Sequence, residues 1–390
     1  MKPQLPDSLC VSRLVAELDR TLTGGRVCRV FAPGPDKAVL EVGVEGGVVG
    51  LLLCWRPGLP RIHLVAEAEP TRERVPFVET LRRRLEGAII ARVTQQAFDR
   101  VIEMGFINLE NLGPSARGRL IVELTGRQAN CLLLDSDELI IAVARPTPDR
   151  DDLYRVLAPG RPYRPPPGQD KMHPRSVDPE TLAGAAALEP EKTISELLSS
   201  RLQGISPLLA GELERRTGLS LGAPLRQLED NWTERLCAAL AEVFAEADKG
   251  EAWLHLASDK SPVVAYPLIL QHLLDQGAVA VASPSLSEAV ASVADAAEIR
   301  QKADTLRGQI VRALRHDLEH KQHLLELREA ELREAQQADK WRRWGELLMA
   351  NLHVLRDVNP GSLVEVVDFY SADQRTITIP LLPSKGARET

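Results

Sequence analysis

Aromatic residues, cysteines and long apolar runs are all scarce in this 390-residue sequence. Aromatic residues make up 4% of the chain, so aliphatic side chains must fill its core. The five cysteines are scattered and never form a C-x-x-C pair, which disfavours a zinc site or a disulfide framework. No run of about 18 apolar residues is present, so we expect no membrane partner. The first residues also lack the apolar stretch of a secretory signal, and we expect a cytoplasmic protein.

The common signatures of catalysis are missing as well. The sequence has no G-x-S-x-G elbow, P-loop, H-E-x-x-H helix or G-x-G-x-x-G motif. We therefore expect no catalytic residue and no cofactor, and an enzymatic role is disfavoured. His316, His320 and His323 have the spacing of metal ligands on one helix face, but no further ligand accompanies them. A polar helix face is the simpler interpretation, and we expect no metal.

The charge of the chain does not decide its partner. A net charge of −7 argues against nonspecific wrapping of nucleic acid, because phosphate neutralisation provides most of that affinity. A local basic face remains compatible with it, since 38 arginines accompany only 10 lysines and a guanidinium matches phosphate geometry. A GC-rich genome would produce the same bias, so composition leaves the question open.

Residues 1–168 are expected to form a β-rich domain. Strand patterns occur at 38–44, 48–55, 89–93, 101–106, 119–124, 129–134 and 139–144, and helical patterns at 14–22 and 76–85. Turn residues separate the later strands, which indicates an antiparallel sheet, sandwich or barrel. The proline-rich stretch 159–168 is predicted to be a stiff extended connector outside any sheet, and it marks the first domain boundary.

Residues 169–280 are expected to form a helical domain, with a helical pattern from about 189 to 277. Its clearest feature is the turn at 204–207 between two amphipathic helices, because Ser206 suits a helix cap and Pro207 the first helical position. A helix-hairpin-helix turn of this kind can present backbone amides to phosphate, although simple helix packing also explains it. Gly204 and Ser206 are therefore candidate contacts to an RNA backbone.

Residues 281–357 are predicted to be a long coiled-coil helix, and 358–390 a β-hairpin with a polar tail, which makes the fold class α+β. Residues 295–346 contain 11 basic and 11 acidic side chains, so this helix carries charges of both signs in equal number and is not a basic tail. Coiled-coil spacing is present at Ile299, Ala303, Leu306, Ile310 and Ala313. It breaks at Asp317 and His320, which makes a long uninterrupted coil doubtful.

Asp99 and Arg100 follow a predicted strand in the most arginine-rich part of the chain. Taken alone, an Asp-Arg dipeptide is also explained by two solvent-exposed side chains, or by two side chains with a purely structural role. The consecutive Arg82, Arg83 and Arg84 point in different directions on a helix, so at most two of them could contact one phosphate surface. Arg82 and Arg84 are further candidate contacts to an RNA backbone.

Taken in order, several segments resemble the NFACT family, also called fibronectin-binding-protein-A-like. The matching segments are 22–27 (LTGGRV), 77–87 (FVETLRRRLEG), 98–100 (FDR), 122–127 (VELTGR), 159–166 (PGRPYRPP), 204–207 (GISP) and 339–352 (DKWRRWGELLMANL). They cover nearly the whole chain in the family's order. The resemblance implies an N-terminal domain similar to the front domain of formamidopyrimidine-DNA glycosylases, followed by a helix-hairpin-helix domain and a coiled coil.

The resemblance also implies a function. Bacterial members of the family act in ribosome quality control: they bind a large ribosomal subunit with an obstructed peptidyl-tRNA, recruit tRNA of the alanyl type and support untemplated alanine tailing. Asp99 and Arg100 match the family's Asp-Arg pair, which is associated with tRNA binding. Arg100 is then expected on a phosphate or a base edge, and Asp99 on an arginine or a ribose hydroxyl.

The sequence departs from the family pattern in three places. Gln128 and Ala129 stand where the family usually has a histidine and a serine, and Arg83-Arg84 where a Lys-His is common. The chain stops soon after Pro380, whereas family members continue into a second coiled-coil arm and a C-terminal RNA-binding domain. The resemblance therefore implies a shortened member, with alanine tailing in doubt and self-association through the coiled-coil helix as a further expectation.

Two other functions stay open at this point. A degenerate NFACT paralogue could act as a scaffold or as an adhesion protein of the fibronectin-binding type. A glycosylase-like DNA-binding protein is the weaker alternative, because those enzymes use an N-terminal proline and this chain has Lys2 and Pro3 instead.

Overall fold

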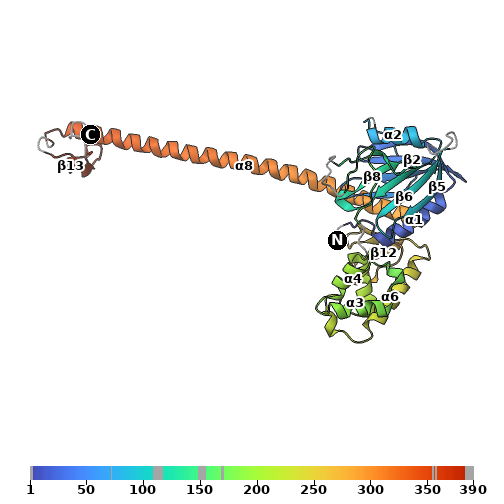
Figure 1. Cartoon of the computed structure of the whole chain (residues 1–390). Helices are drawn as coiled ribbons and strands as arrows, with labels where there is room; N and C mark the ends of the chain where they lie inside the picture. The colour runs from blue at the N-terminus through green and yellow to red at the C-terminus, as the bar shows by residue number, and fades with distance from the viewer. Residues whose placement is uncertain are drawn as a thin grey trace. The chain divides into compact units, whose positions relative to one another are not determined.

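The computed structural model describes residues 3–71, 73–108, 117–147, 155–167, 171–353, 355 and 358–382. The chain divides into two compact units, Met1–Lys302 and Ala303–Thr390. Figure 1 shows the elements of both. The α+β class predicted from the sequence is confirmed: strands dominate the first 150 residues, helices follow, and one helix spans 65 residues.

A nine-stranded antiparallel sheet dominates the first unit, with the strand order β4-β3-β2-β1-β5-β6-β7-β8-β9. The strands are β1 (Arg26–Gly34), β2 (Lys37–Val44), β3 (Gly47–Cys54), β4 (Arg61–Val65), β5 (Ile89–Gln95), β6 (Val101–Ile107), β7 (Arg117–Glu123), β8 (Asn130–Leu134) and β9 (Ile140–Val143). Two meanders, β1 to β4 and β5 to β9, join where Arg26 pairs with Ile89. The predicted antiparallel arrangement is confirmed.

Helices α1 (Ser8–Leu22) and α2 (Pro76–Leu85) pack on this sheet, α1 against β5 and α2 against β1 (Figure 1). Helix α1 begins after Asp7, whose carboxylate accepts the backbone N–H of Cys10 at 2.9 Å. Helix α2 has the bounds predicted from the sequence, with Pro76 in its first turn. The two helices therefore cover a sheet whose strands the alternating apolar residues had largely located.

Strands β1 and β4 were not predicted, for local reasons. A register shift between Val27 and Arg29 in β1 leaves Cys28 and Arg29 both exposed, which breaks the alternation that signals a strand. Strand β4 has only five residues, of which the first three are buried. Both strands are fixed by pairing with β2 and β3 rather than by a pattern of their own.

The proline-rich stretch was expected to lie outside any sheet, and over the described residues 159–167 it contributes no strand to a sheet, although it makes one isolated bridge. Pro162 forms a bridge with Leu139, and the N–H of Tyr163 donates to the Glu138 carbonyl at 2.9 Å. Proline itself has no N–H to donate, but its neighbours on either side supply the hydrogen bonds. The Tyr163 hydroxyl also donates to the buried Glu123 carboxylate at 2.9 Å, which ties this stretch to β7.

Helices follow in the rest of the first unit. They are α3 (Pro179–Leu188), α4 (Ile194–Arg201), α5 (Pro207–Thr217), α6 (Trp232–Ala247) and α7 (Gln271–Asp275). The helical pattern predicted to reach about residue 277 is wrong over 253–266, which contains β10 (Trp253–Leu256) and β11 (Pro262–Tyr266); these two strands form a three-stranded sheet with β12 (Val279–Ala282). Strands of four or five residues are too short to show a clear alternation.

One apolar core extends from Leu9 to Val293 through the first unit. It contains side chains from both sides of the boundaries expected at 168 and 280. The division into the four domains 1–168, 169–280, 281–357 and 358–390 therefore remains a prediction.

Helix α8 (Leu286–Ala350) begins after Ser285, at the predicted position. The backbone N–H groups of Leu286 and Ser287 donate to the Glu17 carboxylate at 2.8 and 3.2 Å, so an acidic side chain from α1 caps the positive end of α8. Three turns further on, the carboxylate of Glu298 lies 2.6 Å from the Lys37 ammonium and 2.6 Å from the Arg61 guanidinium.

Burial acts to raise the pKa of Glu298, but these two cations outweigh it. Hydrogen bonds from Lys37 and Arg61 lower the pKa of the Glu298 carboxyl to about 2. The first turns of α8 are therefore held by an ionised carboxylate against β2 and β4.

In the second unit, β13 (Leu363–Val367) and β14 (Thr376–Pro380) form the predicted hairpin. Leu347 and Leu348, near the C-terminal end of α8, pack with Val364 and Ile379 of this hairpin. Arg343 binds Asp368 at 2.5 Å just beyond β13. The second unit thus has a small apolar core of its own.

Candidate functional site

A tight loop between β5 and β6 carries Asp99 and Arg100. Ala97 and Phe98 have φ angles of 45° and 55°, in the left-handed region that costs an L-residue about 1 kcal/mol or more. The Phe98 ring is buried and lies 4.6 Å from the His173 ring and 5.8 Å from the Phe244 ring, measured between centroids. Packing of this ring offsets the strain and fixes the orientation of the loop.

Hydrogen bonds hold the backbone on both sides of the pair. The Gln95 amide donates to the Asp99 carbonyl at 2.7 Å, and the Leu124 N–H donates to the Arg100 carbonyl at 2.8 Å. The Asp99 carboxylate accepts the N–H of Arg100 at 2.7 Å through one oxygen, and its other oxygen accepts no hydrogen bond from the residues that the structure describes. The half-buried Arg100 guanidinium makes no hydrogen bond or ion pair within the described residues.

The turn between α4 and α5 forms the facing wall. Gly204 has a φ of +72°, and a β-carbon there would lie 2.7 Å from the Ser8 β-carbon and 2.8 Å from the Phe98 ring. Only glycine fits, both because of the backbone conformation and because of this close approach. The turn and the Asp99 loop are therefore in direct contact through Phe98.

Ser206 caps α5, as the sequence predicted. Its hydroxyl accepts the N–H of Leu209 at 3.1 Å and donates to the Asp7 carboxylate at 2.5 Å. Asp7 also accepts the Tyr266 hydroxyl at 2.9 Å, so a single carboxylate joins α1, α5 and β11. Burial raises the pKa of Asp7, and its hydrogen bonds oppose that change.

These walls enclose a cleft of about 320 Å³ that brings together four predicted residues: Asp99, Arg100, Gly204 and Ser206. Lys171 also lines it. The backbone N–H groups of Gly204, Ile205 and Ser206 donate no hydrogen bond to any residue in the described parts of the chain. An arginine and three residues with available amide donors thus line one cavity, a set of groups that suits a phosphate group.

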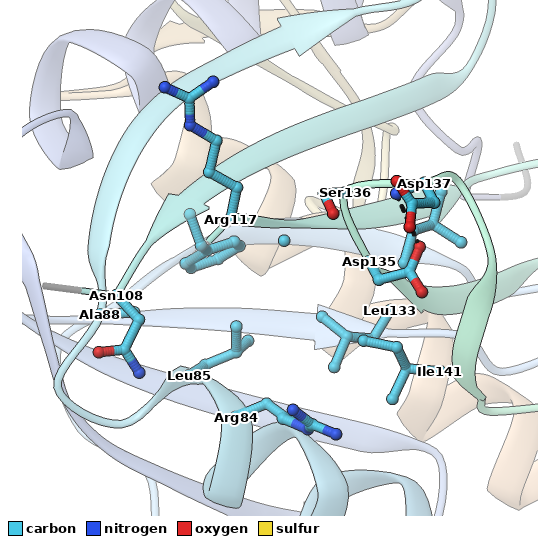
Figure 2. Close-up of a pocket in the computed structure, with 13 residues that line it drawn as sticks. Arg84, Leu85, Ala88, Asn108, Arg117, Leu133, Asp135, Ser136, Asp137 and Ile141 are labelled. Carbon is cyan, nitrogen blue, oxygen red and sulfur yellow. Dashed lines mark hydrogen bonds between the residues drawn. The ribbon is translucent and has the colours of Figure 1, made fainter. Parts of the chain in front are cut away.

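Neither Arg82 nor Arg84 lines this cleft. Arg82 is exposed and binds Glu79 at 2.5 Å on its own helix. Arg84 lines a second cleft, of about 290 Å³, together with Arg117 of β7 and the turn after β8. Figure 2 shows these two arginine side chains on opposite sides of that cleft.

The second cleft has a mixed lining. Leu85 and Leu133 contribute apolar surface (Figure 2). Asp135 closes the turn by accepting the N–H groups of Asp137 and Leu139, both at 2.9 Å. Among the described residues, neither the Arg84 nor the Arg117 side chain has a hydrogen-bonding or ion-pair partner. Two unpaired cations at one cavity make this a second candidate anion-binding surface.

Sequence reasoning missed Asp7, Tyr266 and Lys171. Asp7 precedes a helix and therefore carries an N-cap signal, but its pairing with Ser206 spans 199 positions and has no local signature. Nothing in the sequence around Tyr266 indicates that its hydroxyl reaches Asp7. Lys171 stands four residues after Pro167 and gives no signal either.

The histidines of α8 and the apolar character of the helices bear on metal and membrane binding. His316, His320 and His323 are exposed on α8, and the described residues contain no group of three or more His, Cys, Asp or Glu side chains that could hold a metal ion. None of the helices in the described ranges combines the length and the apolar character needed to cross a bilayer.

Comparison with known proteins places these features in a family. The family described as NFACT N-terminal and middle domains matches residues 7–390. RqcH of Bacillus subtilis (strain 168), described as an Rqc2 homolog, is 27% identical over 392 residues, which is 98% of this chain and 65% of the relative. The chain therefore spans less than two thirds of that protein's length.

Two solved structures share the fold. The fibrinogen binding protein from Staphylococcus aureus matches with a TM-score of 0.58 and 25% identity, over 73% of this chain and 97% of its own. The N-terminal part of the fibronectin/fibrinogen-binding protein from Streptococcus suis matches with a TM-score of 0.57 and 23% identity over the same shares. The family match covers nearly the whole sequence and agrees with the ordered motifs, and on that basis the chain belongs to the NFACT family.

Proposed function

We propose that the chain is an RNA-binding factor of ribosome quality control that binds tRNA in the cleft between the Asp99 loop and the turn 204–207. One observation carries this proposal: the same cavity is lined by Arg100, whose guanidinium has no partner among the described residues, and by Gly204, Ile205 and Ser206, whose amides donate to none of them. All of these groups are hydrogen-bond donors and cannot satisfy one another, whereas the oxygens of one phosphate group could accept from them together.

Each group has a separate role in this proposal. Arg100 donates its planar fork to a phosphate or to a base edge. The amides at the start of α5 donate to a phosphate oxygen, where the helix dipole also favours negative charge. The free oxygen of Asp99 accepts a ribose 2′-hydroxyl, which distinguishes RNA from DNA.

The remaining partners rest on family membership. The proposed partners are tRNA of the alanyl type and the large ribosomal subunit with its peptidyl-tRNA, in the cytoplasm. Because the chain spans 65% of the length of its B. subtilis relative, the proposal covers RNA binding and leaves out elongation of alanine tails. No residue is assigned a catalytic role.

The second cleft provides a subsidiary contact. Arg84 and Arg117 would bind backbone phosphates as point contacts, without reading sequence. Arg82, paired with Glu79, would contribute less.

The test is crosslinking of the tagged protein in cells, followed by sequencing of the bound RNA. Wild type should yield tRNA and large-subunit RNA, and the Asp99→Ala/Arg100→Ala variant should lose the tRNA. Arg226→Ala is the matched control, because it removes an exposed arginine that pairs with Glu191 away from both clefts. This control should retain the tRNA.

The alternative functions give different results in the same experiment. Background RNA in both wild type and the double variant would favour a scaffold or adhesion role and contradict the proposal. Equal amounts of tRNA recovered with wild type and with the double variant would support RNA binding but exclude this cleft as the tRNA site.

A further inference from the structure

His173 lies beside the first cleft, the cavity of about 320 Å³ to which RNA binding is assigned above. The N–H of Met172 donates to the Arg201 carbonyl at 2.8 Å, and the Met172 carbonyl accepts the Gln203 N–H at 2.9 Å, so the backbone here is extended. Side chains two residues apart in an extended segment point to the same side. Lys171 lines the cleft, and His173 therefore follows it on that side.

The imidazole of His173 packs on the loop that carries Asp99 and Arg100. Its ring centroid lies 4.6 Å from that of the buried Phe98, the residue that precedes this pair. The same Phe98 ring is in close contact with the turn at Gly204. Phe98 therefore links the imidazole to a wall of the cleft, and the position of His173 is fixed relative to the RNA-binding groups.

A backbone hydrogen bond determines which ring nitrogen of His173 carries the proton. The Nδ1 atom accepts the Arg175 N–H at 3.1 Å and so caps the short helix η3 (Pro174–Ser176). Burial lowers the pKa of His173, and the positive charge of Arg175 lowers it further, so the ring is neutral at pH 7. In a neutral ring whose Nδ1 accepts, the proton is on Nε2, which can only donate.

This donor is available, whereas the neighbouring cation is not. The Nε2–H of His173 donates to no residue in the part of the chain that the structure describes. The Arg175 guanidinium binds both oxygens of the Asp248 carboxylate, at 2.9 and 2.7 Å, and lies 4.4 Å from the centroid of the Phe244 ring. His173 is therefore the group on this side of the cleft that can donate to a ligand.

We propose that His173 donates its Nε2–H to a second backbone oxygen of the RNA strand whose phosphate lies in the first cleft. This inference rests on the proposed function, and it narrows the ligand to a strand of at least two nucleotides. A cavity of about 320 Å³ is at the lower end of the sizes that enclose a small molecule, so an RNA strand extends beyond it. A neutral donor outside the cavity rewards the continuing backbone without adding charge.

Two substitutions separate donation from packing. His173→Phe keeps an aromatic ring against Phe98 and removes the donor, whereas His173→Gln removes the ring and keeps a side-chain N–H of similar reach. An RNA hairpin should bind His173→Phe about fivefold more weakly than wild type, the loss expected for one neutral hydrogen bond, and His173→Gln nearly as tightly as wild type. The salt dependence should stay the same in both variants, because a neutral donor releases no counterion. Urea midpoints show whether either change affects the fold.

Inorganic phosphate and a matched variant serve as controls. Inorganic phosphate should compete with the hairpin at the same concentration in wild type and in His173→Phe, because a single phosphate fills the cleft without reaching His173. His320→Phe makes the same change at an exposed histidine that lines neither cleft, and it should bind the hairpin like wild type. Arg100→Ala is measured in parallel, because it tests the cleft itself.

Three results would overturn the inference. Wild-type affinity in His173→Phe, together with a loss in Arg100→Ala, would exclude the contact from His173 and leave the proposed function intact. Wild-type affinity in both variants would also exclude the first cleft as the RNA site. Tighter binding by His173→Phe than by His173→Gln would assign His173 a packing role and rule out the donated hydrogen bond.

Discussion

Gly204 and Phe98 stand 106 positions apart in the chain, yet a β-carbon on Gly204 would lie only 2.8 Å from the Phe98 ring. Phe98 is the residue before Asp99, and Gly204 begins the turn that leads to Ser206, the N-cap of α5. The contact therefore sets the distance between the two walls of the cleft. It also explains why a strained loop and a glycine turn occur together.

The first prediction concerns this contact. Gly204→Ala should lower the free energy of unfolding by about 3 kcal/mol, because alanine is strained at a φ of +72° and its methyl group overlaps the Phe98 ring. The variant should also lose tRNA affinity, since Asp99 and Arg100 shift with Phe98. Urea denaturation measures the stability, and a binding titration measures the affinity.

Gly184→Ala is the control for that experiment. Gly184 lies inside α3, and a β-carbon there meets nothing within 4 Å. Alanine should stabilise this helix by about 0.5–1 kcal/mol and leave binding unchanged. Equal stability of the two variants would contradict the role assigned to the Gly204 contact.

The second prediction concerns Arg100. Arg100→Ala should weaken tRNA binding about tenfold and leave the urea midpoint unchanged, because the guanidinium has no partner within the described residues. Arg100→Lys should recover part of the loss, since an ammonium retains the charge but not the two-pronged geometry. A large drop in stability in Arg100→Ala would instead indicate a structural role.

The third prediction separates RNA from DNA through Asp99. Asp99→Ala should reduce binding of an RNA hairpin more than binding of the matching DNA hairpin, because only RNA offers a 2′-hydroxyl to the carboxylate. The comparison is made by competition at one salt concentration. An equal reduction for both hairpins would exclude a ribose contact.

Local chemistry made part of this structure predictable. Helix α2 was located to the residue, because Pro76 begins it and its apolar positions recur at helical spacing. The cap at Ser206 and the C-terminal hairpin followed from similar short-range signals. Asp99 and Arg100 were found only through the family motif, since a dipeptide has no structural signature of its own.

Contacts between distant parts of the chain were not predictable. Glu17 lies in the middle of an amphipathic helix, and its capping of α8 spans 269 positions. The pairing of Asp7 with Ser206 and Tyr266 depends likewise on how α1, α5 and β11 meet. Short strands were missed for a related reason: pairing with a neighbour, rather than their own sequence, makes β10 to β12 a sheet.

The fourth prediction concerns the anchor of α8. The folded Glu298 carboxyl has a pKa of about 2, lowered from 4.5, so its contribution to stability is present above the unfolded value and is lost as pH falls toward 2. Glu298→Gln should be less stable than wild type by about 2 kcal/mol at pH 7. The difference should shrink by more than half at pH 3. Glu326→Gln, exposed on the same helix, should follow wild type throughout.

The fifth prediction tests whether the second cleft adds to the first. Arg84→Ala/Arg117→Ala should weaken RNA binding similarly for all sequences and lower the salt dependence by up to about two ion equivalents. Arg82→Ala should change both quantities less, because Arg82 already binds Glu79. Combined with Arg100→Ala, the effects on binding free energy should add, since the two clefts share no lining residue. Salt titrations of wild type, the double variant, Arg82→Ala, Arg100→Ala and the triple variant measure this. An Arg82 effect as large as that of the double variant would mean a diffuse basic face instead of a defined cleft.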